Sequence, residues 1–257
     1  MTTTIALAGK GGVGKTTISA MVIKYLAQTQ PGAVLAIDAD PSSNLNMVLG
    51  LELDWTVGDI REDMLMQVKD SLLGSGAAMG ALPGGTSKRD YLDYHIRSSL
   101  AEGGKFDLIA MGRGEGQGCY CAVNHNLREV IDALSKNYTY VVIDNEAGME
   151  HLSRRTTNNV DTLCIVAEPT SVGALTAQRI FNLARKLPIV VKRIGVVWSR
   201  TSQGRELDGI EVLGSIPYDQ AVSDASMQGK TVFDIQDDSP AFVAARKILA
   251  EMMVSNS

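Results

Sequence analysis

The chain has 257 residues, of which 45% are hydrophobic and 5% aromatic, with a formal net charge of −5 at pH 7. This length fits one large domain with a sizeable core. The negative charge argues against nucleic acid as the main partner, because a phosphate backbone requires a basic surface. No run approaches the ~20 apolar residues of a membrane span, and the start lacks a basic signal-like region. We therefore expect a cytoplasmic protein without nucleic-acid binding or stable membrane association.

Predicted strands and helices alternate along the chain. Short apolar runs predict strands at residues 4–8, 34–37, 105–111, 138–143, 162–167, 194–198 and 211–216. Helical spacing of apolar residues predicts helices at about 15–27, 127–134, 175–187 and 240–253. This alternation is typical of an α/β fold with a doubly wound, mostly parallel sheet.

One stretch fits the alternation poorly. Residues 64–102 contain the Gly-, Ser- and Pro-rich runs 74–76 and 83–85, which predict loops around short helices. We expect a single domain over residues 1–257, with this stretch as an insertion on one face.

The most informative motif directly follows the first predicted strand. Residues 9–17 read G-K-G-G-V-G-K-T-T, which fits the phosphate-binding pattern G-x-x-x-x-G-K-[ST] between a strand and a helix. Glycines let backbone N–H groups approach phosphate oxygens, and the helix start adds its positive dipole end. Lys15 should reach the β- and γ-phosphates, and the Thr16 hydroxyl should bind Mg²⁺. The residues expected to bind the nucleotide here are Gly9, Lys10, Gly11, Gly12, Val13, Gly14, Lys15, Thr16 and Thr17.

Two further predicted strands end in carboxylates. Asp38 and Asp40 follow residues 34–37, and Asp144 follows residues 138–143. Ligands of open α/β sheets bind outside the carboxyl ends of strands, so these side chains should face the phosphates. There a carboxylate can hold Mg²⁺ or position the attacking water, and Asp144 begins a D-x-x-x-G switch pattern. The alternative is that each Asp caps the turn that follows it.

Two cysteines form a second motif. Cys119 and Cys121 lie one residue apart, after the Gly-rich loop 112–118 and at the start of a predicted helix. Such spacing can present two sulfurs to one soft metal ion, and a helix N-terminus favours the thiolate. Two sulfurs do not complete a tetrahedral site. His125 could be a third ligand, but a two-fold dimer supplies four thiolates, which would bind Zn²⁺ or Ni²⁺.

The alternative for these cysteines is a half-buried position under a loop, because cysteine is common in protein cores. Cys164, inside the predicted strand 162–167, is expected to be such a core residue.

A second lysine in the phosphate-binding motif, Lys10, makes the sequence resemble a known family. With this second lysine, residues 9–17 resemble the deviant Walker A loop of the P-loop group that holds MinD, ParA, the arsenite pump ATPase and the nitrogenase iron protein. The resemblance implies a homodimer that sandwiches ATP, in which Lys10 contacts the phosphates of the other chain. It also implies that Asp38-x-Asp40-Pro41 is switch I, with Asp40 positioning water, and that Asp144 begins switch II. The implied catalytic residues are Lys10, Lys15, Asp40 and Asp144.

The base-binding segments match this group only in part. The group usually reads adenine with an Asn after the strand at 194–198, where this sequence has Trp198 and Ser199. Pro217 and Tyr218 resemble the second loop that contacts the base.

The cysteine segment adds a resemblance to one family within this group. G-C-Y-C-A-V-N at 118–124 and A-G-M-E-H-L at 147–152 resemble segments of the CooC-type nickel-insertion ATPases. The resemblance implies Ni²⁺ or Zn²⁺ bound by Cys119 and Cys121 of two chains. It also implies that ATP hydrolysis is coupled to the maturation of carbon monoxide dehydrogenase or acetyl-CoA synthase. His151 is expected to be structural.

Two other functions remain open. A positioning ATPase on membrane or DNA predicts a basic C-terminal helix, but the end of this chain offers only Arg246 and Lys247. Iron–sulfur electron transfer predicts two cysteines well separated in sequence, whereas Cys119 and Cys121 are one residue apart.

Overall fold

The computed structural model describes residues 2–73, 82, 85–113, 121–147 and 159–254. In this part of the chain, an eight-stranded sheet has the order β3-β4-β2-β5-β1-β6-β7-β8. Its strands are β1 (Thr3–Gly9), β2 (Val34–Ala39), β3 (Ala101–Glu102), β4 (Phe106–Ala110), β5 (Tyr140–Ala147), β6 (Asn159–Ala167), β7 (Val190–Ser199) and β8 (Glu211–Ile216). All neighbours pair in parallel except β3, which runs antiparallel to β4 at the edge. The predicted mostly parallel α/β fold is confirmed.

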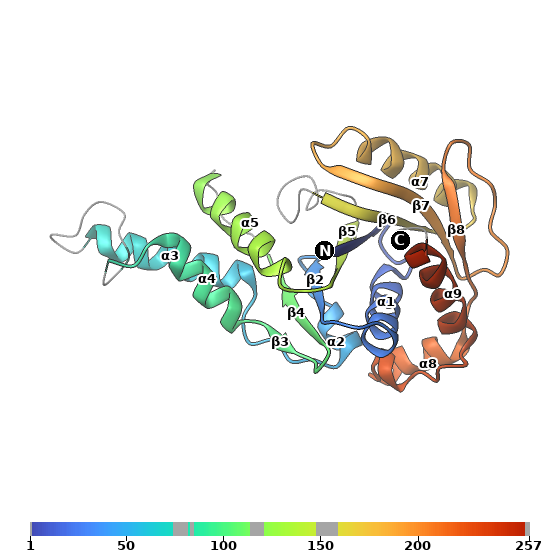
Figure 1. The fold of residues 1–257 in the computed structure, drawn as a ribbon, viewed down its shortest axis with the longest axis horizontal. Helices are drawn as coiled ribbons and strands as arrows, with labels where there is room; N and C mark the ends of the chain where they lie inside the picture. The colour runs from blue at the N-terminus through green and yellow to red at the C-terminus, as the bar shows by residue number, and fades with distance from the viewer. Residues whose placement is uncertain (1, 74–81, 83–84, 114–120, 148–158, 255–257) are drawn as a thin grey trace.

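Helices cover both faces of the sheet (Figure 1). One face carries α1 (Lys15–Thr29), α2 (Leu45–Leu49), α8 (Gln220–Met227), the short η2 (Val232–Asp234) and α9 (Pro240–Val254). The other face carries α3 (Val57–Leu73), α4 (Lys88–Ser98), α5 (Cys121–Ser135) and α7 (Ser171–Ala184). None of the helices in these ranges has the length and apolar character needed to cross a bilayer.

The sheet separates two hydrophobic cores. In β1, Ile5 and Leu7 pack into the core that contains α1, while Ala6 and Ala8 pack into the opposite core. Successive strand residues point to opposite faces, and a central parallel strand is buried on both. This burial explains why the strand reads as one continuous apolar run.

Residues 64–102 are more helical than expected. Instead of short helices, α3 has 17 residues and α4 has 11. The two helices lie side by side and extend beyond the edge of the sheet (Figure 1). Tyr91 of α4 donates a hydrogen bond to Asp63 of α3. Buried apolar residues at helical spacing, Val57, Ile60 and Met64, anchor the start of α3 in the core.

Several elements begin or end away from their predicted limits. β2 and β5 extend beyond residues 37 and 143, because Asp38 pairs with Asp144 in the ladder and Ala39 pairs with Asn145. Both acidic residues therefore lie within strands rather than after them. α7 begins at Ser171 rather than near 175, because the Thr170 side chain accepts a hydrogen bond from the Gly173 N–H and caps the helix.

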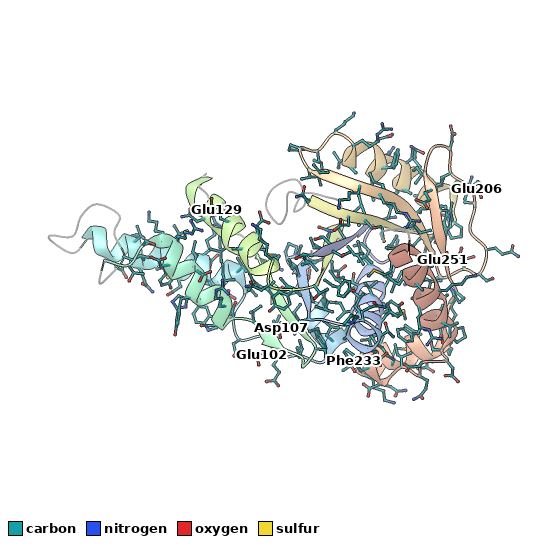
Figure 2. All side chains as sticks on the ribbon, in the orientation of Figure 1. Glu102, Asp107, Glu129, Glu206, Phe233 and Glu251 are labelled. Atoms are coloured by element: carbon teal, nitrogen blue, oxygen red, sulfur yellow. The ribbon has the colours of Figure 1, made fainter. Side chains whose placement is uncertain are left out.

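An aromatic pair lies at the edge of the core that contains α1. Phe233 of η2, labelled in Figure 2, stacks on Phe106 of β4 with ring centroids 5.4 Å apart. This contact joins a C-terminal segment to the β4 side of the sheet. The chain thus folds back across the face that carries α1.

Candidate functional site

The phosphate loop joins β1 to α1. Gly12 and Gly14 have positive φ angles of 81° and 93°, and a Cβ added at either position would meet no atom within 4 Å. The open side of the loop is thus backbone without side chains, as close approach of phosphate oxygens requires. Gly14 precedes the first helical residue, Lys15.

The start of α1 is an anion site by its own geometry. No side chain caps this end, and no acidic residue lies in the first turn. The first N–H groups of a helix have no partner within the helix, and together with the helix dipole they favour a negatively charged ligand. Lys15 is only 7% exposed, and its Nζ donates a 3.2 Å hydrogen bond to the Lys10 carbonyl. The ammonium group thus lies folded along the loop that would hold the phosphates.

Asp144 links the sheet to the first turns of α1. It is 1% exposed and accepts a 3.0 Å hydrogen bond from the Ser19 hydroxyl. Burial raises the pKa of this carboxyl, while hydrogen bonds from Thr16 and Ser19 and the charge of Lys15 oppose the rise. Thr16 therefore lies beside a carboxylate, which is the donor set expected for Mg²⁺ with its water shell.

Asp38 holds the segment that carries Asp40. It is fully buried, and its carboxylate accepts hydrogen bonds from the Asp40 N–H at 3.0 Å and the Leu45 N–H at 2.9 Å. Burial raises the pKa of Asp38 to about 7, against those two hydrogen bonds, and the charges of Asp144 and Asp40 add to the rise. Asp40 itself is half-buried and accepts a 2.8 Å hydrogen bond from the Ser42 N–H.

A cavity of about 240 Å³ opens beside the phosphate loop. It lies between the start of α1, the ends of β7 and β8, and α8. Pro217 and Tyr218 line it beside Gly14 and Thr17, so the structure brings the predicted base-contacting loop to the phosphate loop. The walls combine apolar side chains, such as Ile18 and Met21, with a few polar ones, a mixture that suits a nucleotide base.

Trp198 does not reach this cavity. It is fully buried in the opposite core, and its Nε1 donates a 2.9 Å hydrogen bond to the Arg205 carbonyl. Of the two residues that stand where the MinD/ParA group has its Asn, only Ser199 lines the cavity.

Sequence reasoning missed an ion pair beside the site. Arg200 has a positive φ of 57°, and its Nη1 lies 3.0 Å from Oε1 of Glu168. Arg200 lines the cavity near Tyr218, and Glu168 lines a second cavity of about 230 Å³ together with the exposed Lys10. A single arginine in a turn carries no sequence signal for such a pairing.

The cysteine motif is described only at one end. Cys119 lies outside the described residues, as do Gly148 and His151, and Cys121 is the first residue of α5. Within the described ranges, no group of three or more His, Cys, Asp or Glu side chains could hold a metal ion. Cys164 is buried in the sheet, and burial raises the pKa of its thiol to about 12. A thiol in that state is unreactive.

The start of the loop after β4 is hydrogen-bonded to β2 and to α3. The Met111 N–H donates a 2.8 Å hydrogen bond to the Asp38 carbonyl, and the Gly58 N–H donates a 3.0 Å bond to the Met111 carbonyl. A Cβ on Gly58 would lie 2.3 Å from the Arg113 carbonyl oxygen. The backbone of α3 thus touches the segment that continues toward Cys119.

Comparison with known proteins places the chain among nucleotide-binding proteins. Residues 4–232 match the family model described as the CobQ/CobB/MinD/ParA nucleotide binding domain. An uncharacterized ATP-binding protein of Methanocaldococcus jannaschii is 38% identical over 97% of this chain and 98% of its own length. The carbon monoxide dehydrogenase accessory protein CooC of Rhodospirillum rubrum is 32% identical over 94% of this chain and 95% of its own.

A solved structure shares the fold. The septum site-determining protein MinD of Pyrococcus horikoshii, complexed with Mg-ADP, aligns with a TM-score of 0.65. The two chains are 20% identical over 98% of this chain and 96% of that one.

Proposed function

This chain belongs to the CobQ/CobB/MinD/ParA nucleotide-binding family, and on that premise we propose that it is an ATP-hydrolysing dimeric metallochaperone. It would insert nickel into carbon monoxide dehydrogenase or acetyl-CoA synthase as one ATPase domain spanning residues 1–257. The observation that carries this proposal is the Cys-x-Cys motif at 119–121 in a chain 32% identical to a carbon monoxide dehydrogenase accessory protein over nearly its full length.

The residues of the phosphate loop fit ATP and Mg²⁺. Backbone N–H groups from Gly9 to Thr17 and the Lys15 ammonium would bind the phosphates, and the Thr16 hydroxyl would hold the metal. When bound, Mg²⁺ neutralises charge that develops on the phosphate oxygens. Asp144 keeps Thr16 in place through its hydrogen bond and senses the filled site as the first residue of switch II.

Hydrolysis requires a positioned water molecule. Asp40 is the candidate for that role, because its backbone is fixed by Asp38 while its side chain remains half-exposed at the ends of the strands. Lys10 is exposed on the same side of the molecule as the phosphate loop, so it is free to reach the phosphates of a second chain. Pro217 and Tyr218 would contact the base.

The metal cargo would be shared by two chains. Cys119 and Cys121 of each chain supply four thiolates, which matches the coordination number of Zn²⁺ or of tetrahedral Ni²⁺. The hydrogen bond from Met111 to Asp38 supports coupling, since a shift of switch I would pull on the loop before the cysteines. ATP-driven dimerisation would then assemble the metal site, and hydrolysis would release the ion to the client enzyme.

Metal titration tests the ligands. We expect Cys119→Ala and Cys121→Ala each to abolish stoichiometric Ni²⁺ or Zn²⁺ binding, because two or more sulfurs leave the shared site. Cys164→Ala is the matched control, since Cys164 is buried in the sheet and should leave metal binding intact. Isothermal titration of the three variants against the unmodified chain gives the stoichiometry.

Undiminished metal binding by both motif variants would remove these cysteines as ligands and leave a nucleotide-binding ATPase without a metal role. Loss of binding in Cys164→Ala as well would point to a fold effect, which the melting temperature of each variant would reveal.

A further inference from the structure

Strand β5 contains a β-bulge directly after Asp144. On the β1 side of this strand, Leu7 pairs with Asp144 and the next pair is Gly9 with Ala147, so β5 has one residue more than β1 in this interval. On the β2 side the pairing stays regular up to Asn145. A bulge bends the strand that carries it, and bulges are common next to active sites. Here the bulge lies between the phosphate loop and the segment predicted to be switch II.

The side chain of Asn145 spans this bulge. Asn145 is 1% exposed, and its Nδ2 donates a 2.8 Å hydrogen bond to the Leu7 carbonyl. Its Oδ1 is buried and has no hydrogen-bond partner among the described residues. A buried amide oxygen without a partner destabilises the fold, and a leucine of similar shape would avoid that cost. The hydrogen bond to Leu7 is the described contact that a leucine could not make.

Two successive side chains attach the end of β5 to its surroundings. Val142 packs in the core that contains α1, and Ile143 packs in the opposite core. By alternation, Asp144 faces α1, where it accepts the hydrogen bond from Ser19, and Asn145 faces the other core. The end of β5 is thus attached to α1 through Asp144 and to β1 through Asn145.

The end of β1 has little room to shift at this point. A Cβ on Gly9, the first residue of the phosphate loop, would lie 2.3 Å from the Val166 carbonyl oxygen of β6. Leu7 and Ala8, which precede Gly9, are fully buried. Because β1 is packed this tightly, loss of the bond across the bulge should displace the end of β5 rather than the phosphate loop.

We propose that Asn145 is a positioning residue for ATP hydrolysis, whose side-chain amide holds the bulge and thereby sets the register of switch II against the phosphate loop. The inference rests on the proposed function, because it takes ATP hydrolysis as the reaction. The phosphates would be bound by the loop backbone, by Lys15 and by the start of α1, none of which belongs to β5. Loss of the Asn145 hydrogen bond should therefore leave ATP binding intact and slow the chemical step, which needs precisely placed groups.

The rate of phosphate release from Mg-ATP and the Kd of a non-hydrolysable Mg-ATP analogue test this role in the full chain. Asn145→Leu keeps the approximate shape of the side chain and removes the hydrogen bond to Leu7. We expect kcat to fall about 10- to 100-fold, the effect of a small misplacement of reacting groups, and Kd to stay within about twofold. The melting temperature should stay within about 4 °C of that of the unmodified chain. Asn145→Ser, whose side chain is shorter, should lose kcat in the same way.

Asn46→Leu is the matched control. Asn46 of α2 has the same pattern of contacts, because its Nδ2 donates a 3.2 Å hydrogen bond to the Leu51 carbonyl and its buried Oδ1 has no partner among the described residues. It does not belong to the β1–β5 ladder. This variant should keep kcat within about twofold of the unmodified chain.

An analogue affinity that falls as much as kcat in both Asn145 variants would show a general loss of structure and overturn the inference, as would an equal loss of kcat in Asn46→Leu. If the unmodified chain released no phosphate from ATP, the proposed function itself would fail. Phosphate release by the unmodified chain with an unchanged kcat in Asn145→Leu would leave the proposed function standing and remove only the positioning role.

Discussion

At the scale of single residues, the site depends on two buried carboxylates that lie opposite each other on neighbouring strands. Asp38 and Asp144 pair in the β2–β5 ladder, and both are at most 1% exposed. Asp38 orders the Asp40 segment, and Asp144 orders the first turns of α1. Burial raises the pKa of each, and the pKa of Asp38 reaches about 7, so the Asp38 carboxyl is partly protonated near neutral pH. A cation bound between the two segments would favour their charged forms.

The raised pKa of Asp38 predicts a pH-dependent stability difference. Its folded-state pKa is about 7 against an ordinary value of 3.8, so the folded chain holds this proton more tightly. The resulting stabilisation is complete below pH 3.8 and is lost as the pH rises through 7. Asp38→Asn has no such proton. We expect its deficit in unfolding free energy to shrink between pH 4 and pH 8 by more than ~1 kcal/mol, since one pKa unit corresponds to about 1.4.

Urea denaturation at a series of pH values measures this difference, with Asp54→Asn at an exposed position as the control. A deficit of Asp38→Asn that stayed constant or grew with pH would contradict the assignment of a raised pKa to this carboxyl.

At the scale of elements, the start of α3 packs closely against the loop after β4 and is hydrogen-bonded to it. Gly58 leaves room for the Arg113 carbonyl, and its N–H donates a hydrogen bond to the Met111 carbonyl. The Met111 N–H in turn donates a hydrogen bond to the Asp38 carbonyl. The same hydrogen-bond path reaches from the ends of the strands to the helical pair α3–α4 that extends beyond the sheet (Figure 1). The backbone at Asp38 is thus connected through Met111 to the start of α3.

Gly58→Ala tests whether this close contact between α3 and the loop after β4 stabilises the fold. Its Cβ would lie 2.3 Å from the Arg113 carbonyl oxygen, so backbone must shift. We expect a loss of about 1–3 kcal/mol in unfolding free energy, the usual cost of overpacking. Glu62→Ala, an exposed change on the same helix, should cost less than about 0.5 kcal/mol. Equal stability of the two variants in chemical denaturation would show that α3 and the loop are not tightly joined.

The sequence predicted the elements whose signals are local. Every strand except the two-residue edge strand β3 was predicted as an apolar run, because the central strands are buried on both faces. The phosphate loop was predicted because it has fixed residues at fixed spacing. The length of α3 was not predicted, because the buried Arg61 and the half-buried Asp63 and Gln67 break the pattern of apolar residues on its inner face. The left-handed Arg200, its pairing with Glu168 and the inward turn of Ser199 could not be predicted, since they depend on contacts between strands far apart in sequence.

At the scale of the whole molecule, the account depends on two chains acting together. The phosphate loop, with the exposed Lys10, follows β1, and the cysteine motif comes after β4 along the chain. Ligands of such folds bind at the carboxyl ends of the strands. A two-fold axis on this side would bring the same patches together twice. One chain alone has two motif cysteines, and in the proposed dimer two chains would supply the four thiolates of a closed tetrahedral site.

The most direct test is the mass and metal content of the protein, measured by native mass spectrometry with and without a non-hydrolysable ATP analogue, Mg²⁺ and Ni²⁺. We predict a single chain without the analogue, and with it a dimer that carries one nickel ion per two chains and loses that ion in Cys119→Ala. A chain that stays monomeric with the analogue bound, or a dimer whose nickel content is the same in Cys119→Ala, would contradict the account.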